Sequence, residues 1–217
     1  THTDDKEGDL TFTADQAVVS KISDDQIKDE LAKFIGDIKQ RPSSVSAIKI
    51  DGKTAHARVR AGESVEIAER EITIYELITK DIRHTADAIE VEITVTCSAG
   101  TYIRAIARDL GDKLKIGGHL ISLRRTLVSP FSIEQCQSVK DAELIPVGEV
   151  IEKLFPIRKL ELSQSREISF GRVIEQNSSE EVFAAIDNLG NFVALLQNKL
   201  QGNLVVAAPI LVSGSGQ

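Results

Sequence analysis

Two segments in the first half of the chain alternate apolar and polar residues, a pattern typical of strands with one buried face. They are residues 71–79, EITIYELIT, and residues 89–97, IEVEITVTC. In the second segment every other side chain is apolar, so these side chains share one face of the strand. A third strand is predicted at residues 44–50, SVSAIKI, followed by a turn at residues 51–52.

Apolar residues recur at helical spacing in three other segments. A capping-box pattern, Ser-x-x-Gln, opens residues 24–39, and a helix is predicted there. We expect it to end before Arg41-Pro42, because the residue before proline disfavours helical backbone. Residues 103–114 predict an amphipathic helix directly after the second strand, and residues 145–155 predict a further short helix.

The pattern changes after Pro156 to short apolar segments separated by Gly and Asn, which indicates a small barrel or sandwich. We therefore expect a first domain over residues 1–155 and a β-rich domain over residues 156–212. Residues 213–217, SGSGQ, are expected to be a disordered tail.

Composition narrows the class of protein. The 217 residues are 41% hydrophobic and 27% charged, as in an ordinary globular protein, and no apolar run has the length needed to span a bilayer. Two cysteines, Cys97 and Cys136, are too few for a disulfide framework or a metal cage, so we expect a reducing, cytoplasmic environment and no metal. The net charge of -7 argues weakly against nucleic acid as a partner.

Basic residues nevertheless gather in two groups. Between residues 33 and 60 there are seven basic residues and two acidic ones. The first group comprises Lys33, Lys39, Arg41, Lys49, Lys53, Arg58 and Arg60, and the second comprises Arg104, Arg108, Lys113, Lys115, Arg124 and Arg125. A solvated face and a phosphate-binding surface are both open interpretations of these groups.

The junction between the second strand and the following helix reads CSAGTYIRAIARDLG, residues 97–111. Side chains at such a junction are presented to a ligand by a rigid scaffold. Tyr102 can stack on a base or line a pocket, and Arg104 offers a planar fork for a carboxylate or phosphate. A buried tyrosine with a surface arginine is the alternative. Cys97 falls on the buried face, although a thiol nucleophile paired with His119 is conceivable.

This junction, together with GGHLISLRRTLVSPF at residues 117–131, closely resembles the TruB family of tRNA pseudouridine synthases, in particular its actinobacterial branch. Residues 41–77, which begin RPSSVSAIKIDGK, are similar to the second signature of that family. The segment TDDKEGD at residues 3–9 is similar to its acidic segment. The resemblance covers roughly residues 1–140.

The resemblance implies an α+β fold, with a mixed, mostly antiparallel sheet flanked by helices. Residues 157–211 would form the small PUA-like RNA-binding domain of the family. It also implies cofactor-free conversion of uridine-55 in the T loop of tRNA to pseudouridine, with the base flipped into a pocket. The T arm of tRNA would be the partner of a monomeric chain.

The family resemblance also assigns roles to individual residues. Tyr102 would border the uracil, and Arg104 would hold the carboxylate of the catalytic aspartate ionised and aimed. Leu123 would supply an apolar wall of the pocket. Residues 41–62 would grip the T loop, with the basic side chains as phosphate ligands and Lys49 alternatively structural. The substrate-binding candidates are Lys49, Lys53, Arg58, Arg60, Leu123, Arg124 and Arg125.

The catalytic aspartate of the family lies in a Gly-x-Leu-Asp-Pro motif, and this motif does not occur among the 217 residues. The resemblance therefore predicts the C-terminal part of such an enzyme, inactive by itself. A non-catalytic tRNA-binding module is the alternative. His56 stands where the family usually has Tyr, and we interpret it as a surface histidine. We interpret His119 as capping a turn, and Asp109 as bonding backbone or arginine.

Overall fold

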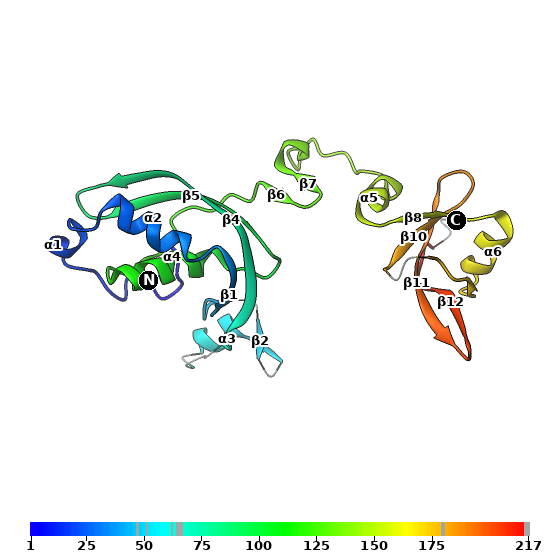
Figure 1. The fold of residues 1–217 in the computed structure, drawn as a ribbon, viewed down its shortest axis with the longest axis horizontal. Helices are drawn as coiled ribbons and strands as arrows, with labels where there is room; N and C mark the ends of the chain where they lie inside the picture. The colour runs from blue at the N-terminus through cyan, green and yellow to red at the C-terminus, as the bar shows by residue number, and fades with distance from the viewer. Residues whose placement is uncertain (47, 51, 62, 64–66, 179–180, 215–217) are drawn as a thin grey trace. The chain divides into compact units, whose positions relative to one another are not determined.

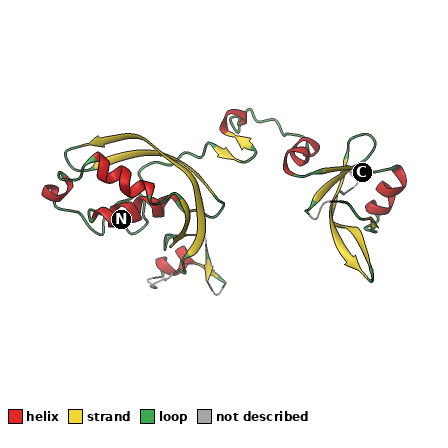
Figure 2. Cartoon of the chain, viewed as in Figure 1, coloured by secondary structure: helices red, strands yellow, loops and turns green. Residues whose placement is uncertain are grey.

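The computed structural model describes residues 1–46, 48–50, 52–61, 63, 67–178 and 181–214. The chain forms two compact units, Thr1–Leu123 and Arg124–Gln217 (Figure 1). Helices and mostly antiparallel strands occur in both units, which confirms the α+β class (Figure 2). Within the described ranges, no helix combines the length and the apolar character that a membrane crossing requires.

The first unit is built around a three-stranded antiparallel sheet with the order β1-β4-β5. Ile38 of β1 lies opposite Ile72 of β4, and Ile74 lies opposite Cys97 of β5. The elements are α1 (Gln16–Val19), α2 (Asp24–Ala32), β1 (Gly36–Gln40), β2 (Lys49–Ile50), β3 (Lys53–Thr54), α3 (Ala55–Arg60), β4 (Arg70–His84), β5 (Ile89–Cys97) and α4 (Ile103–Leu114).

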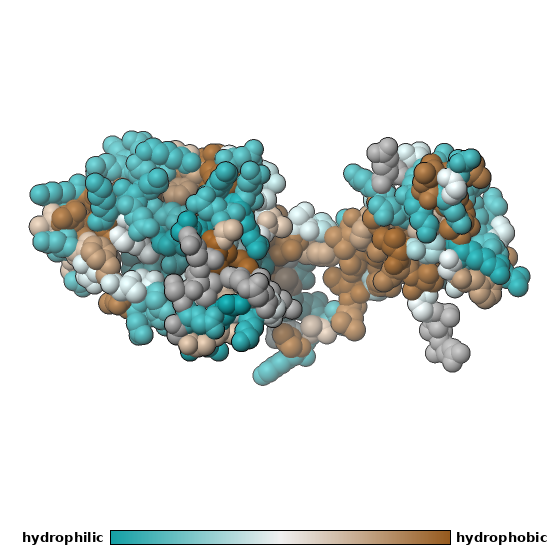
Figure 3. Space-filling model, turned by 90° about the horizontal axis from the view of Figure 1, so that it is seen from below, coloured by the Kyte–Doolittle hydropathy of each residue, from teal (hydrophilic) through white to brown (hydrophobic). Residues whose placement is uncertain are grey.

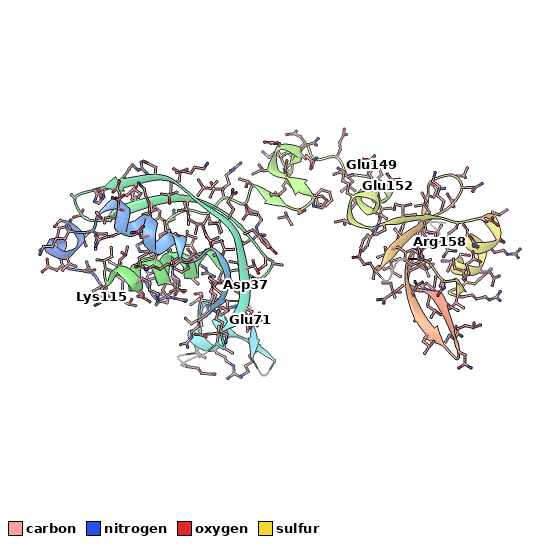
Figure 4. All side chains as sticks on the ribbon, viewed as in Figure 1. Asp37, Glu71, Lys115, Glu149, Glu152 and Arg158 are labelled. Carbon is pink, nitrogen blue, oxygen red and sulfur yellow. The ribbon has the colours of Figure 1, made fainter. Side chains whose placement is uncertain are left out.

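Helices α2 and α4 cover one face of this sheet (Figure 1). Ile27 and Leu31 of α2, Ile74 of β4 and Ile106 of α4 are each at most 1% exposed and form the centre of the core. The alternate side chains of β5, from Ile89 to Cys97, pack against this core, as their shared face predicts. Side chains on the opposite face are exposed, among them Asp37 of β1 and Glu71 of β4 (Figure 4).

The helix predicted at residues 24–39 is wrong in its second half. Helix α2 has the expected capping box but ends at Ala32, and β1 begins at Gly36, whose φ of +102° is incompatible with a right-handed helix. From Phe34 onward the burial alternates with period two, and Ile35 is 48% exposed. The apolar residues from Ile27 to Ile38 belong to two elements, a helix and a strand, whose apolar side chains pack in the same core. Their combined spacing therefore resembles that of one long helix.

The strand predicted at residues 44–50 is also wrong except at its end. Only Lys49–Ile50 pair, with Lys53–Thr54, in a hairpin that turns at Gly52. The carbonyl oxygen of Val45 accepts from an arginine side chain, and those of Ser46 and Ile48 accept from the N–H groups of His56 and Ala55. These partners replace a neighbouring strand. Asp51 and Ala47 lie outside the described residues.

The second unit contains a five-stranded sheet with the order β8-β10-β11-β12-β9, in which only β8 and β10 are parallel. Its core includes Ile168, Phe183 and Leu196, each fully buried. The elements are β6 (Leu127–Val128), β7 (Phe131–Ser132), the 3-10 helix Ile133–Gln135, α5 (Val147–Leu154), β8 (Ile157–Lys159), α6 (Leu162–Ser169), β9 (Ile174–Glu175), β10 (Phe183–Ile186), β11 (Phe192–Gln201) and β12 (Leu204–Val212).

The predicted helix at residues 145–155 is confirmed as α5, and the segments after Pro156 are β-rich as expected. The sequence interpretation missed α6, which a capping box between Glu161 and Gln164 opens. Apolar side chains are exposed on this unit (Figure 3). Leu144 and Leu162 are two of the exposed residues. Of the predicted tail, residues 215–217 lie outside the described part.

Candidate functional site

The junction between β5 and α4 carries two site candidates, Tyr102 and Arg104, which lie two residues apart shortly after the end of β5. Gly100 has a φ of +85°, which turns the chain out of the strand. Tyr102 is the N-cap of α4, with extended backbone, and its side chain makes no capping hydrogen bond. Arg104 therefore lies in the first turn of α4, and Arg108 follows one turn later on the same side.

Arg104 anchors two distant segments of the first unit. Its Nη1 donates to the carbonyl oxygen of Thr3 at 3.2 Å and to Oδ2 of Asp5 at 2.8 Å. Its Nη2 donates to the carbonyl oxygen of Val45 at 3.0 Å. A guanidinium held by three acceptors in different directions is fixed in orientation.

Arg108 makes a second set of contacts with the same segments. It pairs with Asp4 at 3.1 Å and with the neighbouring Asp109 at 2.7 Å, and it donates to the carbonyl oxygen of Arg41 at 2.8 Å. The interpretation of Asp109 as an arginine partner is confirmed. Two arginines thus hold the N-terminal segment against α4, and a bridge between Asp5 and Leu120 adds to this attachment.

Two of the three aspartates that pair with these arginines have pKa values shifted in opposite directions. Burial by itself raises the pKa of the Asp5 carboxyl, but hydrogen bonds from Thr3, Glu7 and Arg104 and the charge of Arg104 lower that pKa below its ordinary value overall. Burial raises the pKa of Asp109, and the hydrogen bond and charge of Arg108 oppose the effect only in part. Asp5 is therefore a carboxylate at neutral pH and keeps Arg104 paired.

The backbone of Tyr102 is held by Gln40, a residue that the sequence interpretation did not select. The Nε2 of Gln40 donates to the carbonyl oxygen of Tyr102 at 3.1 Å, and its Oε1 accepts from the N–H of Tyr102 at 2.8 Å. No local pattern indicates this contact, because the two residues are 62 positions apart. The sequence also does not indicate that Asp4 and Asp5 are the partners of these arginines, although their segment is similar to the acidic segment of the family.

The basic candidates between residues 49 and 60 lie on the β2-β3 hairpin and α3. Lys53 and Arg60 are exposed, whereas Arg58 is only partly exposed and pairs with Glu63 at 3.1 Å. The side chain of Lys49 lies outside the described part of the structure. The segment before the hairpin contacts Arg104 through Val45, so this basic element is tied to the arginine of the junction.

The remaining candidates follow α4. Leu123 is the last residue of the first unit and is 59% exposed. Arg124 and Arg125 begin the second unit and are exposed. Tyr102 and Arg104 thus lie together in one junction, whereas Leu123, Arg124 and Arg125 are surface side chains.

Two histidines differ from their sequence interpretation. His56 is partly buried, because its Nδ1 lies 3.2 Å from the carbonyl oxygen of Ser46 and its Nε2 lies 3.4 Å from the Thr54 hydroxyl. It stabilises the hairpin and is not a simple surface residue. His119 is exposed, and within the described residues its ring makes no hydrogen bond that would cap a turn.

Cys97 is partly buried and packs against the core, which supports the structural interpretation over a thiol nucleophile. Cys136 is exposed and provides an internal comparison.

We expect a thiol-reactive probe to label Cys136 at least about tenfold faster than Cys97 in the folded chain, because the probe must reach the sulfur. Peptide mass spectrometry at short reaction times measures both rates. Faster labelling of Cys97 would support the nucleophile.

Two family models match consecutive parts of the chain. Residues 1–103 match the model of the TruB family pseudouridylate synthase N-terminal domain. Residues 104–153 match that of the tRNA pseudouridylate synthase B C-terminal domain. The boundary between the two matches falls inside the junction, next to Arg104.

Curated relatives named tRNA pseudouridine synthase B are similar over almost the whole chain. The relative from Corynebacterium aurimucosum is 39% identical over 204 residues, which are 92% of this chain and 68% of the relative. The relative from Corynebacterium diphtheriae is 38% identical over 216 residues, 96% of this chain and 72% of the relative. The relative from Paenarthrobacter aurescens is 39% identical and is matched over 100% of this chain and 72% of its own length.

Solved structures share the fold. A Cbf5-Nop10-Gar1 complex contains a chain that matches with a TM-score of 0.62 at 19% identity, over 89% of this chain and 62% of that one. A structure of an H/ACA RNP bound to a substrate RNA containing 2'-deoxyuridine also matches with a TM-score of 0.62, at 18% identity, over 88% and 61%. This chain thus spans about three fifths of those two chains. With both family models matched in order along the sequence and curated relatives near 39% identity, the chain belongs to the TruB family of pseudouridylate synthases.

Proposed function

We propose that the chain carries the arginine side of the uridine pocket and the RNA-contacting surface of a tRNA pseudouridine synthase that acts on uridine-55 of the T loop. Its family and the names of its curated relatives support this proposal. The observation that carries it is the fixed guanidinium of Arg104, two residues after Tyr102 at the start of α4.

Arg104 has donors to spare for a reacting group. A guanidinium has five N–H donors, and the hydrogen bonds of Arg104 to described residues use three of them. Nε–H and one Nη2–H remain, enough to bind a second carboxylate or a phosphate with two hydrogen bonds. We assign to Arg104 the orientation of the catalytic carboxylate, which a positive charge also keeps ionised. Tyr102 would border the uracil ring.

The reaction itself needs no cofactor in this proposal. The bond between C1' of the ribose and N1 of uracil breaks, the ring turns, and C1' bonds to C5. The C5 hydrogen passes to solvent as a proton and N1 takes up a proton, so the product is an isomer of the substrate. The base must first leave the stack of the T loop, and the site would hold it by ring contact and hydrogen bonds. The Gly-x-Leu-Asp-Pro motif is not among these 217 residues, so we propose that they bind the RNA but do not isomerise it by themselves.

Basic side chains would position the RNA through its phosphates, which are contacted without regard to sequence. Lys53 and Arg60 are exposed on the hairpin and helix that follow the Val45 segment. Leu123 would form an apolar wall of the pocket. Lys49, Arg58, Arg124 and Arg125 complete the proposed set.

Binding to a T-arm hairpin tests the RNA surface. We expect Arg60→Glu to weaken binding about tenfold at low salt and to reduce the salt dependence of the affinity, because one phosphate contact is lost and a repulsion is added. Fluorescence anisotropy with a labelled hairpin measures both. Lys28→Glu is the matched control, since Lys28 is an exposed helical residue on α2, outside the proposed surface. Equal losses in the two variants would contradict the proposed surface.

Release of tritium from T-arm RNA that carries 5-tritiated uridine tests the chemistry. The 217-residue chain is expected to bind this RNA without releasing tritium. Release above background would show that a carboxylate within these residues acts as the catalyst and would overturn that part of the proposal.

A non-catalytic tRNA-binding module that uses the same surface is the second candidate. A chimera separates it from the enzyme: the segment that carries the Gly-x-Leu-Asp-Pro motif in an actinobacterial relative is joined before Thr1. Tritium release by the chimera would support the synthase, and it should fall at least about a hundredfold in an Arg104→Met chimera, as for other preorganised electrostatic groups. A folded chimera that binds RNA without release would support the module.

A further inference from the structure

Gln40 is buried at the end of β1, with 2% of its surface exposed. Its backbone belongs to the sheet, where it lies opposite Arg70 of β4. Its side-chain amide turns to the β5-α4 junction and is satisfied at both ends by one residue, Tyr102. A buried amide without partners would be costly, so this paired contact stabilises one arrangement of the junction.

The two hydrogen bonds of Gln40 restrain Tyr102 on both sides of its Cα. One binds the N–H that precedes the Cα, and the other binds the carbonyl group that follows it, so rotation about both φ and ψ is limited. The helix restrains only the carbonyl side, through the N–H of Ala105 at 3.1 Å. The N–H of an N-cap residue has no partner within its helix, and here Gln40 supplies it.

Fixing these dihedral angles fixes the direction of the Cα–Cβ bond of Tyr102, from which the ring extends. The backbone stays extended, with φ of -100° and ψ of 103°, while the next residue is helical. The Cα–Cβ bond follows from the positions of the backbone atoms, so a loosened peptide would spread the ring over a wider range of directions.

We propose that Gln40 is a positioning residue that aims the Tyr102 ring at the pyrimidine base of the substrate RNA. The proposal rests on the proposed function, because it takes the ring of Tyr102 as the group that contacts the base. Gln40 itself touches the backbone of Tyr102 and not the RNA.

Hydrogen exchange of the unaltered chain tests the contact without any substitution. The amide of Tyr102 is expected to exchange at least about a hundredfold more slowly than that of Ile103, which has no acceptor among the described residues. Equal exchange of the two amides would overturn the proposal at its first step.

The order of the ring is measured by tyrosine fluorescence. The chain has two tyrosines and no tryptophan, so Tyr75→Phe leaves Tyr102 as the single emitter. In this background, Gln40→Met keeps the length of the side chain and removes both hydrogen bonds. The amplitude of fast depolarisation of Tyr102 is expected to rise at least about twofold. Gln40→Glu, which keeps the acceptor for the N–H but not the donor, is expected to give a smaller rise.

Ser98→Ala is the matched control for a merely structural effect. The hydroxyl of Ser98 accepts from the N–H of Thr73 at 3.0 Å at the same junction, without contacting the Tyr102 peptide. Its loss should lower the melting temperature and leave the depolarisation of Tyr102 unchanged. If Ser98→Ala and Gln40→Met loosen the ring equally, Gln40 has no positioning role and the proposal is wrong.

RNA binding separates this inference from the proposed function. The measured quantity is the ratio of affinities for a T-arm hairpin with uridine at the target position and for one with an abasic site there. The ratio is expected to fall about tenfold in Gln40→Met, since an aromatic contact with a base is worth about that factor. If the fast depolarisation of Tyr102 rises in Gln40→Met while the affinity ratio is unchanged, Tyr102 does not contact the base. If the depolarisation of Tyr102 is unchanged, Gln40 does not position the ring.

Discussion

Gly111→Ala is expected to destabilise the first unit by about 3 kcal/mol or more, because it forces backbone atoms apart in a packed region. A Cβ built on Gly111 would overlap the carbonyl carbon of Gly117 and the nitrogen of Gly118. These are backbone atoms of the turn that leaves α4, and they have no rotamer by which to move away.

The turn is also bonded to Gly111. The N–H groups of Ile116 and Gly117 both donate to the carbonyl oxygen of Gly111, at 3.0 and 3.1 Å. Moving the turn to admit a methyl group would weaken these bonds and displace Leu120, which pairs with the acidic segment at Asp4. The expected loss therefore includes part of the attachment of the N-terminal segment.

Urea unfolding followed by tyrosine fluorescence measures this loss, since both tyrosines, Tyr75 and Tyr102, lie in the first unit. Gly148→Ala is the control. Gly148 is also a helical glycine, in α5, but the nearest atom to its added Cβ is 4.0 Å away. Alanine there should leave the fluorescence-detected unfolding of the first unit unchanged, and it should stabilise the second unit, whose unfolding is followed by circular dichroism, by about 0.5–1 kcal/mol. A loss below about 0.5 kcal/mol for Gly111→Ala would contradict the close packing of the turn on α4.

The sequence predicts well those elements in which the apolar residues keep one spacing, either helical or alternating, from end to end. The alternation of β5 and the helical spacing of α4 each direct a single face to the same core, so local pattern and tertiary packing agree. The helix prediction for residues 24–39 fails because Phe34 is buried in the core that also receives α2 and the partly buried Ile38 packs against it, and burial alone does not tell a helix from a strand.

The site was predicted in its side chains but not in its contacts. Tyr102 and Arg104 are identified from the family motif, which is a short continuous stretch of sequence. Their partners, Gln40 and Asp5, lie 62 and 99 positions away along the chain. Such pairings are fixed by the topology of the sheet and by the path of the N-terminal segment, neither of which a local pattern contains.

Arg104→Met is expected to destabilise the first unit by about 2–4 kcal/mol, because it leaves the Asp5 carboxylate without its charged partner and removes a donor from two backbone carbonyl groups, of which only that of Thr3 keeps a second donor, the hydroxyl of Ser43. Both side chains are largely shielded, with 26% of Arg104 and 22% of Asp5 exposed, so solvent screens the pair only in part. Arg83→Met is the control: Arg83 is 64% exposed and pairs with Glu90 at 2.9 Å, and its loss should cost less than about 1 kcal/mol.

A double-mutant cycle with Asp5→Asn isolates the pair from the backbone contacts of Arg104. The coupling between Arg104→Met and Asp5→Asn is expected to be about 1–2 kcal/mol at neutral pH. The pKa of Asp5 is lowered in the folded chain, so its stabilisation is complete above the unfolded pKa of about 4 and is lost as the pH falls through the folded value. The stability difference between Asp5→Asn and the unaltered chain should therefore shrink below about pH 4. A coupling near zero, or one that does not change on acidification, would mean that Arg104 is held by the carbonyl groups of Thr3 and Val45 alone, and that Asp5 is not needed to present it.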